Sequence, residues 1–175
     1  MKILAFGASN SSTSINKQLA TYTAGQMTGA DVTILDLNDF EMPIYSIDRE
    51  KAGGIPSLAH DFKAEVKKAD KIIISFAEHN GGYSAAFKNI MDWMSRIEGD
   101  TWEGKPFFML STSPGGRGGA TVLGQATGRF GFMGGKVLAS FSLPRFSENF
   151  EAEKGIVNAD LKGAFDKELG KFISG

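Results

Sequence analysis

A run of hydroxyl and amide side chains follows the first apolar segment of the chain. The polar residues singled out in this run are Ser9, Ser11, Ser14 and Asn16. Helical spacing of apolar residues begins at Ile15, so the run leads into a helix. Backbone N–H groups at a helix N-terminus, with hydroxyls around them, bind anions without a counter-charge. The run is therefore predicted to hold a phosphate group; the alternative is that these side chains only cap the helix.

Two further loops combine polar side chains with glycine. The first follows the most strand-like run and contains Ala77, Glu78, His79, Asn80 and Gly81. The second contains Ser113, Gly115, Gly116 and Arg117. Glycine costs conformational entropy, and that cost is usual where a ligand lies against the backbone. The loops are predicted to face a flat heterocycle that carries one phosphate, as FMN does; the alternative is two mobile connections.

Short apolar runs alternate with helical patterns along the whole chain. Strands are predicted at 2–7, 31–37, 71–77, 106–111 and 136–142. Because these runs are continuously apolar, they indicate a parallel sheet covered on both faces. Right-handed crossovers then make a doubly wound sheet the simplest topology, with ligands bound at the carboxyl ends of its strands. The sequence predicts a three-layer α/β fold in a single domain over residues 1–175.

The composition argues against several other classes of function. The chain has no cysteine, which excludes disulfides, thiolate catalysis and iron–sulfur clusters. His60 and His79 have no second ligand at helical spacing, so no metal site is predicted. The formal net charge is -1, and neither nucleic acid nor a membrane surface is expected as a partner. No apolar stretch approaches the roughly 18 residues of a membrane span, and a cytoplasmic protein is expected.

The loop at Glu78 lies within a longer motif that resembles a known family. Residues 77–93 read AEHNGGYSAAFKNIMDW. This stretch is similar to the middle signature of the NADPH-dependent FMN reductases of the flavodoxin superfamily, roughly P-E-Y-N-x-S-x-P-x-x-L-K-N-x-x-D-W. The matching residues are Glu78, Asn80, Lys88, Asn89, Asp92 and Trp93. The resemblance extends from Met1 to about Phe141 and includes the first loop and the stretch from Met42 to Tyr45.

The resemblance implies a flavodoxin-like sheet of order 2-1-3-4-5, bound FMN, and NADPH or NADH as the hydride donor to a small acceptor such as a flavin, quinone or azo compound. It implies a homodimer or homotetramer, with Trp102, Phe130 and Phe132 as candidate contacts. The flavin carries the chemistry, so no side chain is assigned as catalytic; His79 is the one candidate proton donor. The implied FMN-binding residues are Ser9, Ser11, Ser14, Ile15, Asn16, Ala77, Glu78, His79, Asn80, Gly81, Ser113, Gly115, Gly116 and Arg117.

Two other functions fit the same sheet. A flavodoxin-type electron carrier would lack a nicotinamide site, but such carriers usually have a strongly acidic surface, and this chain is near neutral. A receiver or binding module would need clustered aspartates at the strand ends. At the end of the first predicted strand this chain has Gly7, Ala8 and Ser9. The enzyme is therefore the preferred hypothesis. Since no second phosphate loop is visible, FMN is expected to bind better than FAD.

Ser11 generates the first testable prediction, because the family pattern has an arginine at this position. Hydrogen bonds to charged groups are worth about 1.5–3 kcal/mol, and a serine loses the charge and the bidentate geometry of a guanidinium. The deficit is roughly one to two decades in affinity at about 1.4 kcal/mol per decade. We expect FMN to exchange during dialysis and Ser11→Arg to tighten binding in a salt-sensitive way. Stoichiometric flavin that survives dialysis of the natural sequence would contradict this expectation.

Overall fold

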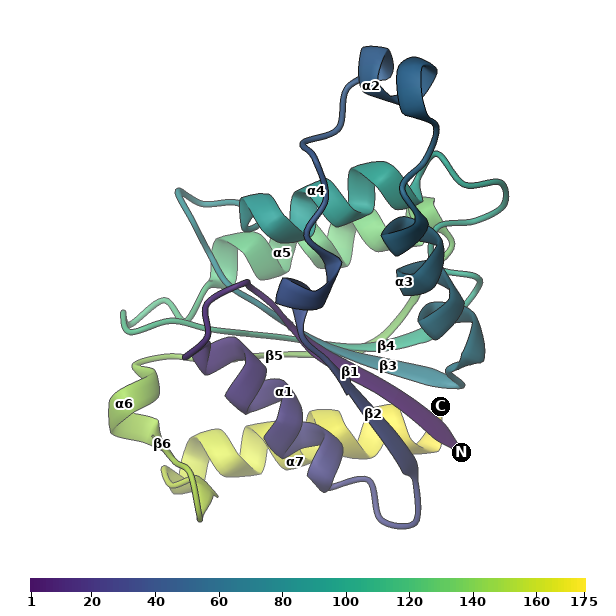
Figure 1. Cartoon of the computed structure of the whole chain (residues 1–175). Coiled ribbons are helices and arrows are strands. Elements are labelled where there is room, and N and C mark those ends of the chain that lie inside the picture. The colour runs from purple at the N-terminus through teal and green to yellow at the C-terminus, as the bar shows by residue number, and fades with distance from the viewer.

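A parallel sheet of five strands forms the centre of the computed structural model, which describes residues 1–175 (Figure 1). The strand order from edge to edge is β2-β1-β3-β4-β5, which confirms the expected order 2-1-3-4-5. The direction of winding reverses between β1 and β3, and the loops that follow these strands flank that point. The strands are β1 (Lys2–Ala8), β2 (Asp31–Leu35), β3 (Lys71–Phe76), β4 (Pro106–Thr112) and β5 (Lys136–Leu143).

Helices cover both faces of the sheet and make the predicted three layers (Figure 1). One face packs against α1 (Ile15–Gly25) and α7 (Ala159–Ser174). The other face packs against α3 (Ser57–Lys68), α4 (Ala85–Met94) and α5 (Ala120–Arg129). None of these helices combines the length and the hydropathy that crossing a bilayer requires.

The shorter elements were not predicted from the sequence. Two single-turn 3-10 helices, η1 (Leu37–Phe40) and η2 (Phe130–Met133), follow β2 and α5. The helices α2 (Ile47–Gly53) and α6 (Phe146–Asn149) are equally brief. A two-stranded hairpin of β6 (Phe150–Glu151) and β7 (Gly155–Ile156) precedes α7. These elements are too short to develop a hydrophobic period, which explains why the sequence pattern did not reveal them.

The second strand differs from its prediction in length and in burial. It ends at Leu35 rather than at residue 37, because the Asp36 carboxylate accepts the N–H of Asn38 and caps η1. The strand was expected to be covered on both faces, but its residues 31–34 are exposed. Its position at the edge of the sheet accounts for that exposure, since β2 pairs with β1 alone.

Two of the three aromatic residues expected at a subunit contact lie in the core instead. Trp102 and Phe130 are both 0% exposed, and their rings stack with centroids 4.7 Å apart. They fill the space between the sheet and α4, where Phe87 packs against both rings. Phe132 is 83% exposed and is the only member of the three on the surface. Residue type alone does not distinguish a core aromatic from an interface aromatic, which is why this expectation was wrong for Trp102 and Phe130.

Gly7 sets how closely α1 approaches β1. A Cβ atom at this position would lie 2.9 Å from the carbonyl carbon of Asn16 and closer still to the backbone of Lys17. Backbone atoms cannot move aside as a flexible side chain can. The absence of a side chain at Gly7 therefore lets the first turn of α1 sit directly against the end of β1.

We expect Gly7→Ala to destabilise the protein by about 1–3 kcal/mol or more, because the added methyl group overpacks two backbone segments. Gly163→Ala is the matched control, since Gly163 lies in the exposed face of α7 and an added Cβ meets nothing within 4 Å. Glycine is a poor helix former, so the control should gain roughly 0.5–1 kcal/mol. Urea unfolding measures both changes. Equal stability of Gly7→Ala and the natural protein would show that α1 can shift without cost.

Candidate functional site

The three loops predicted to meet do meet, at the carboxyl edge of the sheet. They line one cleft of about 210 Å³. The first loop contributes residues 9–16 without Asn10 and Ser12, the second contributes residues 77–79, and the third contributes residues 112–114. The cleft residues are Ser9, Ser11, Thr13, Ser14, Ile15, Asn16, Ala77, Glu78, His79, Thr112, Ser113 and Pro114.

The hydroxyl-rich loop forms the N-terminal end of α1. Ser14 is the N-cap, and its hydroxyl accepts the N–H of Lys17 at 3.1 Å, so this side chain has the capping role. Ser11 is exposed, and its hydroxyl lies 3.4 Å from that of Thr13. The N–H groups of Ile15 and Asn16 precede the helical hydrogen bonds, as the first N–H groups of any helix do. The loop thus presents hydroxyls and free backbone donors on the same side of one cleft.

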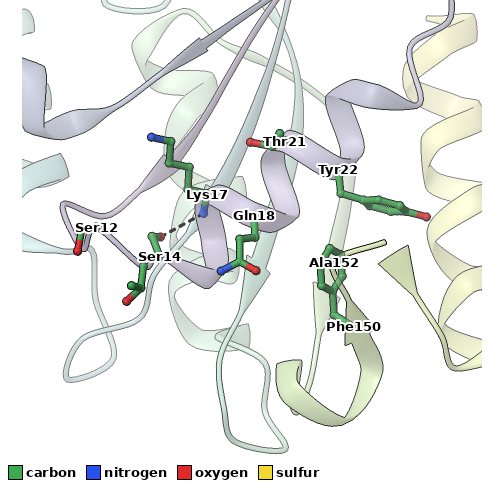
Figure 2. A pocket seen from close by; sticks show the side chains of 9 residues that line it. Ser12, Ser14, Lys17, Gln18, Thr21, Tyr22, Phe150 and Ala152 are labelled. Atoms are coloured by element: carbon green, nitrogen blue, oxygen red, sulfur yellow. Dashed lines mark hydrogen bonds between the residues drawn. The ribbon is translucent and has the colours of Figure 1, made fainter. Parts of the chain in front are cut away.

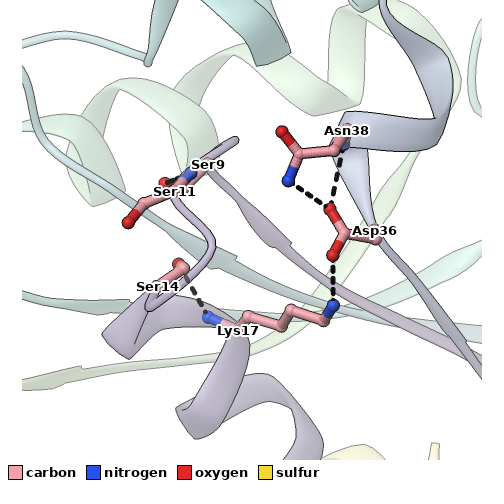
Figure 3. A network of polar contacts seen from close by, with 6 residues as sticks. All are labelled: Ser9, Ser11, Ser14, Lys17, Asp36 and Asn38. Atoms are coloured by element: carbon pink, nitrogen blue, oxygen red, sulfur yellow. Dashed lines mark hydrogen bonds and ion pairs between the residues drawn. The ribbon is translucent and has the colours of Figure 1, made fainter.

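Lys17 and Asp36 form the one ion pair beside this loop (Figure 3). The Lys17 Nζ lies 2.5 Å from Asp36 Oδ2. Hydrogen bonds from the Lys17 ammonium and from the N–H of Asn38 hold the pKa of Asp36 below its usual value. The first turn of α1 carries no acidic residue. The positive end of the helix is therefore not neutralised by a carboxylate of its own, which favours a bound anion.

The side chain of Asn16 joins the start of α1 to the ends of two strands, β3 and β4. It is 3% exposed. Its Nδ2 donates to the Thr112 carbonyl at 3.1 Å, and its Oδ1 accepts the Thr112 N–H at 3.1 Å and the Ser75 hydroxyl at 2.7 Å. Both polar atoms of its side chain thus make hydrogen bonds within the protein. The backbone N–H of Asn16, at the N-terminus of α1, is therefore its candidate contact with a ligand.

The second loop is a tight turn that is fixed on both sides. The N–H of His79 donates to Gly82 O, and the N–H of Gly82 donates to His79 O, each at 3.0 Å. Asn80 has φ 52° and Gly81 φ 78°, the two positive values of a type I′ turn. The Glu78 carboxylate accepts the N–H of Val122 at 2.9 Å, in the first turn of α5. Glu78 is thus a helix-capping carboxylate that also belongs to the cleft lining.

The third loop is held in place rather than mobile. The Gly118 carbonyl accepts the hydroxyls of Ser111 at 2.7 Å and Ser142 at 2.9 Å. Gly118 has φ 58°, and a Cβ there would lie 2.9 Å from the Leu143 carbonyl carbon. The turn therefore requires glycine at this position. It is closed by Arg145, whose N–H donates to the Gly115 carbonyl at 3.0 Å.

Some predicted site residues lie outside the cleft lining. Arg117 donates to the Thr121 hydroxyl at 3.0 Å, within the N-terminal turn of α5. The others outside the lining are Asn80, Gly81, Gly115 and Gly116. Conversely, sequence reasoning missed Thr13, Thr112 and Pro114, although each adjoins a residue that it singled out. The sequence pattern predicts where the loop lies, but the conformation of the loop determines which of its residues line the cleft.

Two residues of the 77–93 motif act in the scaffold instead of the site. The Asn89 amide donates to the carbonyls of Met42 and Pro43 and accepts the N–H of Tyr45 at 2.8 Å. Trp93 is 1% exposed, and its Nε1 donates to Pro43 O at 2.7 Å. Together they tie the segment 42–45 to α4. Lys88 and Asp92 form the expected i,i+4 ion pair, with Nζ 2.6 Å from Oδ1.

Comparison with known proteins identifies the family. The model of the NADPH-dependent FMN reductases matches residues 1–148. The chain belongs to this family. A 2-hydroxy-1,4-benzoquinone reductase from a Burkholderia species is 33% identical over 61% of the chain and 57% of its own length. A quinone reductase from Escherichia coli K12 is 30% identical over 46% of the chain and 43% of its own length. The chain thus spans about half the length of these curated relatives.

A solved structure supports the fold of this FMN reductase family member. FerB, a flavoenzyme NAD(P)H:acceptor oxidoreductase from Paracoccus denitrificans, superposes with a TM-score of 0.75 over 99% of the chain and 97% of its own length. The sequence identity is 22%. At that identity the similarity is one of architecture, and it places the chain among flavodoxin-like folds.

The residues present fit an FMN phosphate. The site offers neutral hydroxyls and two backbone N–H groups at a helix N-terminus. Hydroxyl and amide donors of this kind suit an anion that brings its own charge. The turn at His79 and the loop at Ser113 border the rest of the cleft.

Asn16 generates a prediction that separates scaffold from ligand contact. Asn16→Ala leaves the buried Ser75 hydroxyl and the Thr112 backbone without partners, and each unsatisfied buried group costs about 1–3 kcal/mol. We expect a loss of roughly 2–4 kcal/mol in the free energy of unfolding. Asn10→Ala, in the same loop but exposed, is the control and should change stability by less than about 0.5 kcal/mol. Chemical denaturation of both variants is the measurement, and similar midpoints would refute the assigned role.

Proposed function

We propose that this protein is an NAD(P)H-dependent FMN-binding oxidoreductase that reduces a small quinone-type acceptor. One observation carries the proposal: three loops from β1, β3 and β4 line a single cleft whose hydroxyls and helix N-terminal N–H groups suit a phosphate. Membership of the FMN reductase family and relatives named quinone reductase support the same function. FMN, when bound, would supply the two-electron carrier between reduced nicotinamide and the acceptor.

The proposed binding roles follow from the free donors of each loop. The hydroxyls of Ser9 and Ser11 and the N–H groups of Ile15 and Asn16 would hold the phosphate. The backbone from Ala77 to Glu78 would run along the ring, since the N–H and carbonyl of His79 are already paired within the turn. Ser113 would close the opposite side. Asn80, Gly81, Gly115, Gly116 and Arg117 would shape these loops without lining the cleft.

The proposed reaction does not require a side chain that acts as an acid or a base. Hydride transfer requires none, and His79 is the residue of the cleft that could donate a proton to a reduced quinone. The protein would then orient the flavin ring and leave one side of it accessible to the nicotinamide and the acceptor. His79 is then dispensable for the oxidation of NAD(P)H. It acts only when the reduced acceptor takes up a proton.

An anaerobic titration tests the proposed function. Purified protein is given FMN, then NADPH or NADH, and then a benzoquinone, while the visible absorbance of the flavin is recorded. We expect FMN binding, loss of absorbance with at least one nucleotide, and its recovery on addition of quinone. Bleaching by dithionite but by neither nucleotide would instead indicate an electron carrier.

An acidic substitution in the hydroxyl-rich loop tests where the phosphate binds. Ser9→Asp puts a carboxylate where the phosphate would sit and should weaken FMN binding by at least about tenfold. Ser57→Asp makes the same change at the exposed first residue of α3, where an acidic side chain is favourable, and should leave FMN binding unaltered. Equal FMN affinity of both variants would show that the phosphate does not bind at this loop.

We also propose that the protein is a homodimer or homotetramer and that Phe132 lies in the contact. Phe132 is 83% exposed, with the Arg129 guanidinium 5.9 Å from its ring centroid. It lies next to a cleft of about 310 Å³ between α4 and α5 that includes Arg129 and Tyr83. The Tyr83 hydroxyl is buried without a hydrogen-bond partner, and burial raises the pKa of Tyr83 to about 12. A second subunit would cover an apolar ring that a monomer leaves in water.

Sedimentation velocity at micromolar concentration tests the assembly. We expect a mass of two or four 18.8 kDa chains for the natural protein. Phe132→Asp should shift the distribution toward monomer, because it places a charge in an apolar contact. Ile173→Asp, on α7 at 51% exposure, is the control and should not shift it. A monomeric natural protein would contradict the proposal.

A further inference from the structure

A second and larger cleft adjoins the candidate flavin cleft. Its volume is about 410 Å³. One wall is α1, which presents Ser14, Gln18 and Tyr22, and the opposite wall is the β6–β7 hairpin, which presents Phe150 and Ala152 (Figure 2). Thr13 and Ser14 line both clefts. The two spaces therefore meet next to the residues that would hold the phosphate.

Close packing fixes the hairpin wall of this cleft. The ring of Tyr22 lies so close to Gly155 that a Cβ there would overlap it, and Gly155 has φ 77°. Tyr22 and Phe150 meet edge to face with ring centroids 5.5 Å apart. Phe150 also stacks on Phe146 at 4.7 Å. The hairpin is thus anchored by aromatic contacts on two sides, and the space beneath it is part of the fold.

We propose that this cleft receives the adenylate half of FAD, so that the protein binds FAD as well as FMN. The inference rests on the proposed function, because it extends the same ligand outward from the phosphate. The volume falls in the range of small-molecule sites, about 300–1,000 Å³. Ser12 and Thr13 offer hydroxyls for a second phosphate at the junction. The Gln18 amide both donates and accepts, which suits the polar edge of a base, and Phe150 offers an apolar surface.

The sequence alone led to the opposite expectation, because it contains no second glycine-rich phosphate loop. In the structure, the β6–β7 hairpin and not a glycine-rich loop forms the wall opposite α1. Phe150 and Ala152 are distant in sequence from α1, and only the hairpin that precedes α7 brings them opposite Gln18. A site assembled in this way has no motif of its own. The proposed adenylate site predicts comparable affinity for FMN and FAD, in contrast to the expectation from the sequence.

Calorimetric titrations with FMN and FAD test the inference. For the natural protein we expect dissociation constants within about threefold of each other. Ala152→Trp fills the cleft from an exposed hairpin position and should weaken FAD by at least about tenfold while FMN is unchanged. Gln18→Ala, a substitution that keeps a good helix former, should weaken FAD alone by roughly three- to tenfold. Val157→Trp, at a 40% exposed position outside the cleft lining, is the control and should alter neither flavin.

The outcomes separate this inference from the proposed function. FMN binding with FAD at least about tenfold weaker would overturn the adenylate site and leave the proposed function intact. A loss of both flavins in Ala152→Trp, with the circular dichroism of the natural protein, would also overturn it, since the cleft would then serve FMN. Binding of neither flavin to the natural protein would overturn the proposed function itself.

Discussion

The site depends on the hydrogen bonds of the Asn16 side-chain amide. It lies at the start of α1, yet its partners are Ser75 at the end of β3 and Thr112 at the end of β4. One buried side chain thereby fixes the helix N-terminus relative to two strand ends. Gly7 adds the complementary constraint, because only a residue without a side chain lets α1 approach β1 so closely. The three loops meet in one cleft because these two residues fix the position of α1.

The cleft holds neutral donors rather than fixed positive charges. Lys17, the cation at the first turn of α1, is paired with Asp36, and Arg117 is turned toward Thr121. Hydroxyls and backbone N–H groups remain for a ligand. Such a cradle stabilises a phosphate without holding it as firmly as a guanidinium would. We therefore expect a flavin in this cleft to be released more readily than one held by a guanidinium.

Much of the fold followed from local pattern, and the remainder required tertiary contacts. The five strands and the three loops were predictable because continuous apolar runs and polar turns are local features. Whether Asn16 faces a ligand or the core was not, since that depends on Ser75 and Thr112. The same limit applies to Trp102 and Phe130, whose burial depends on their packing against each other and against Phe87. The hairpin of β6 and β7 has two residues in each strand, too few for any period.

The exposed edge strand links the stability of the sheet to the cleft. β2 has a single neighbour and residues 31–34 lie in solvent, so its amide protons should exchange through local opening, whereas those of β3 and β4 exchange only on global unfolding. The chain passes from β2 straight into Asp36, the partner of Lys17. Each local opening that breaks this ion pair would free an ammonium group beside the hydroxyl-rich loop. The freed charge attracts an anion, so an anion held at that helix end should favour the opening and speed amide exchange along β2.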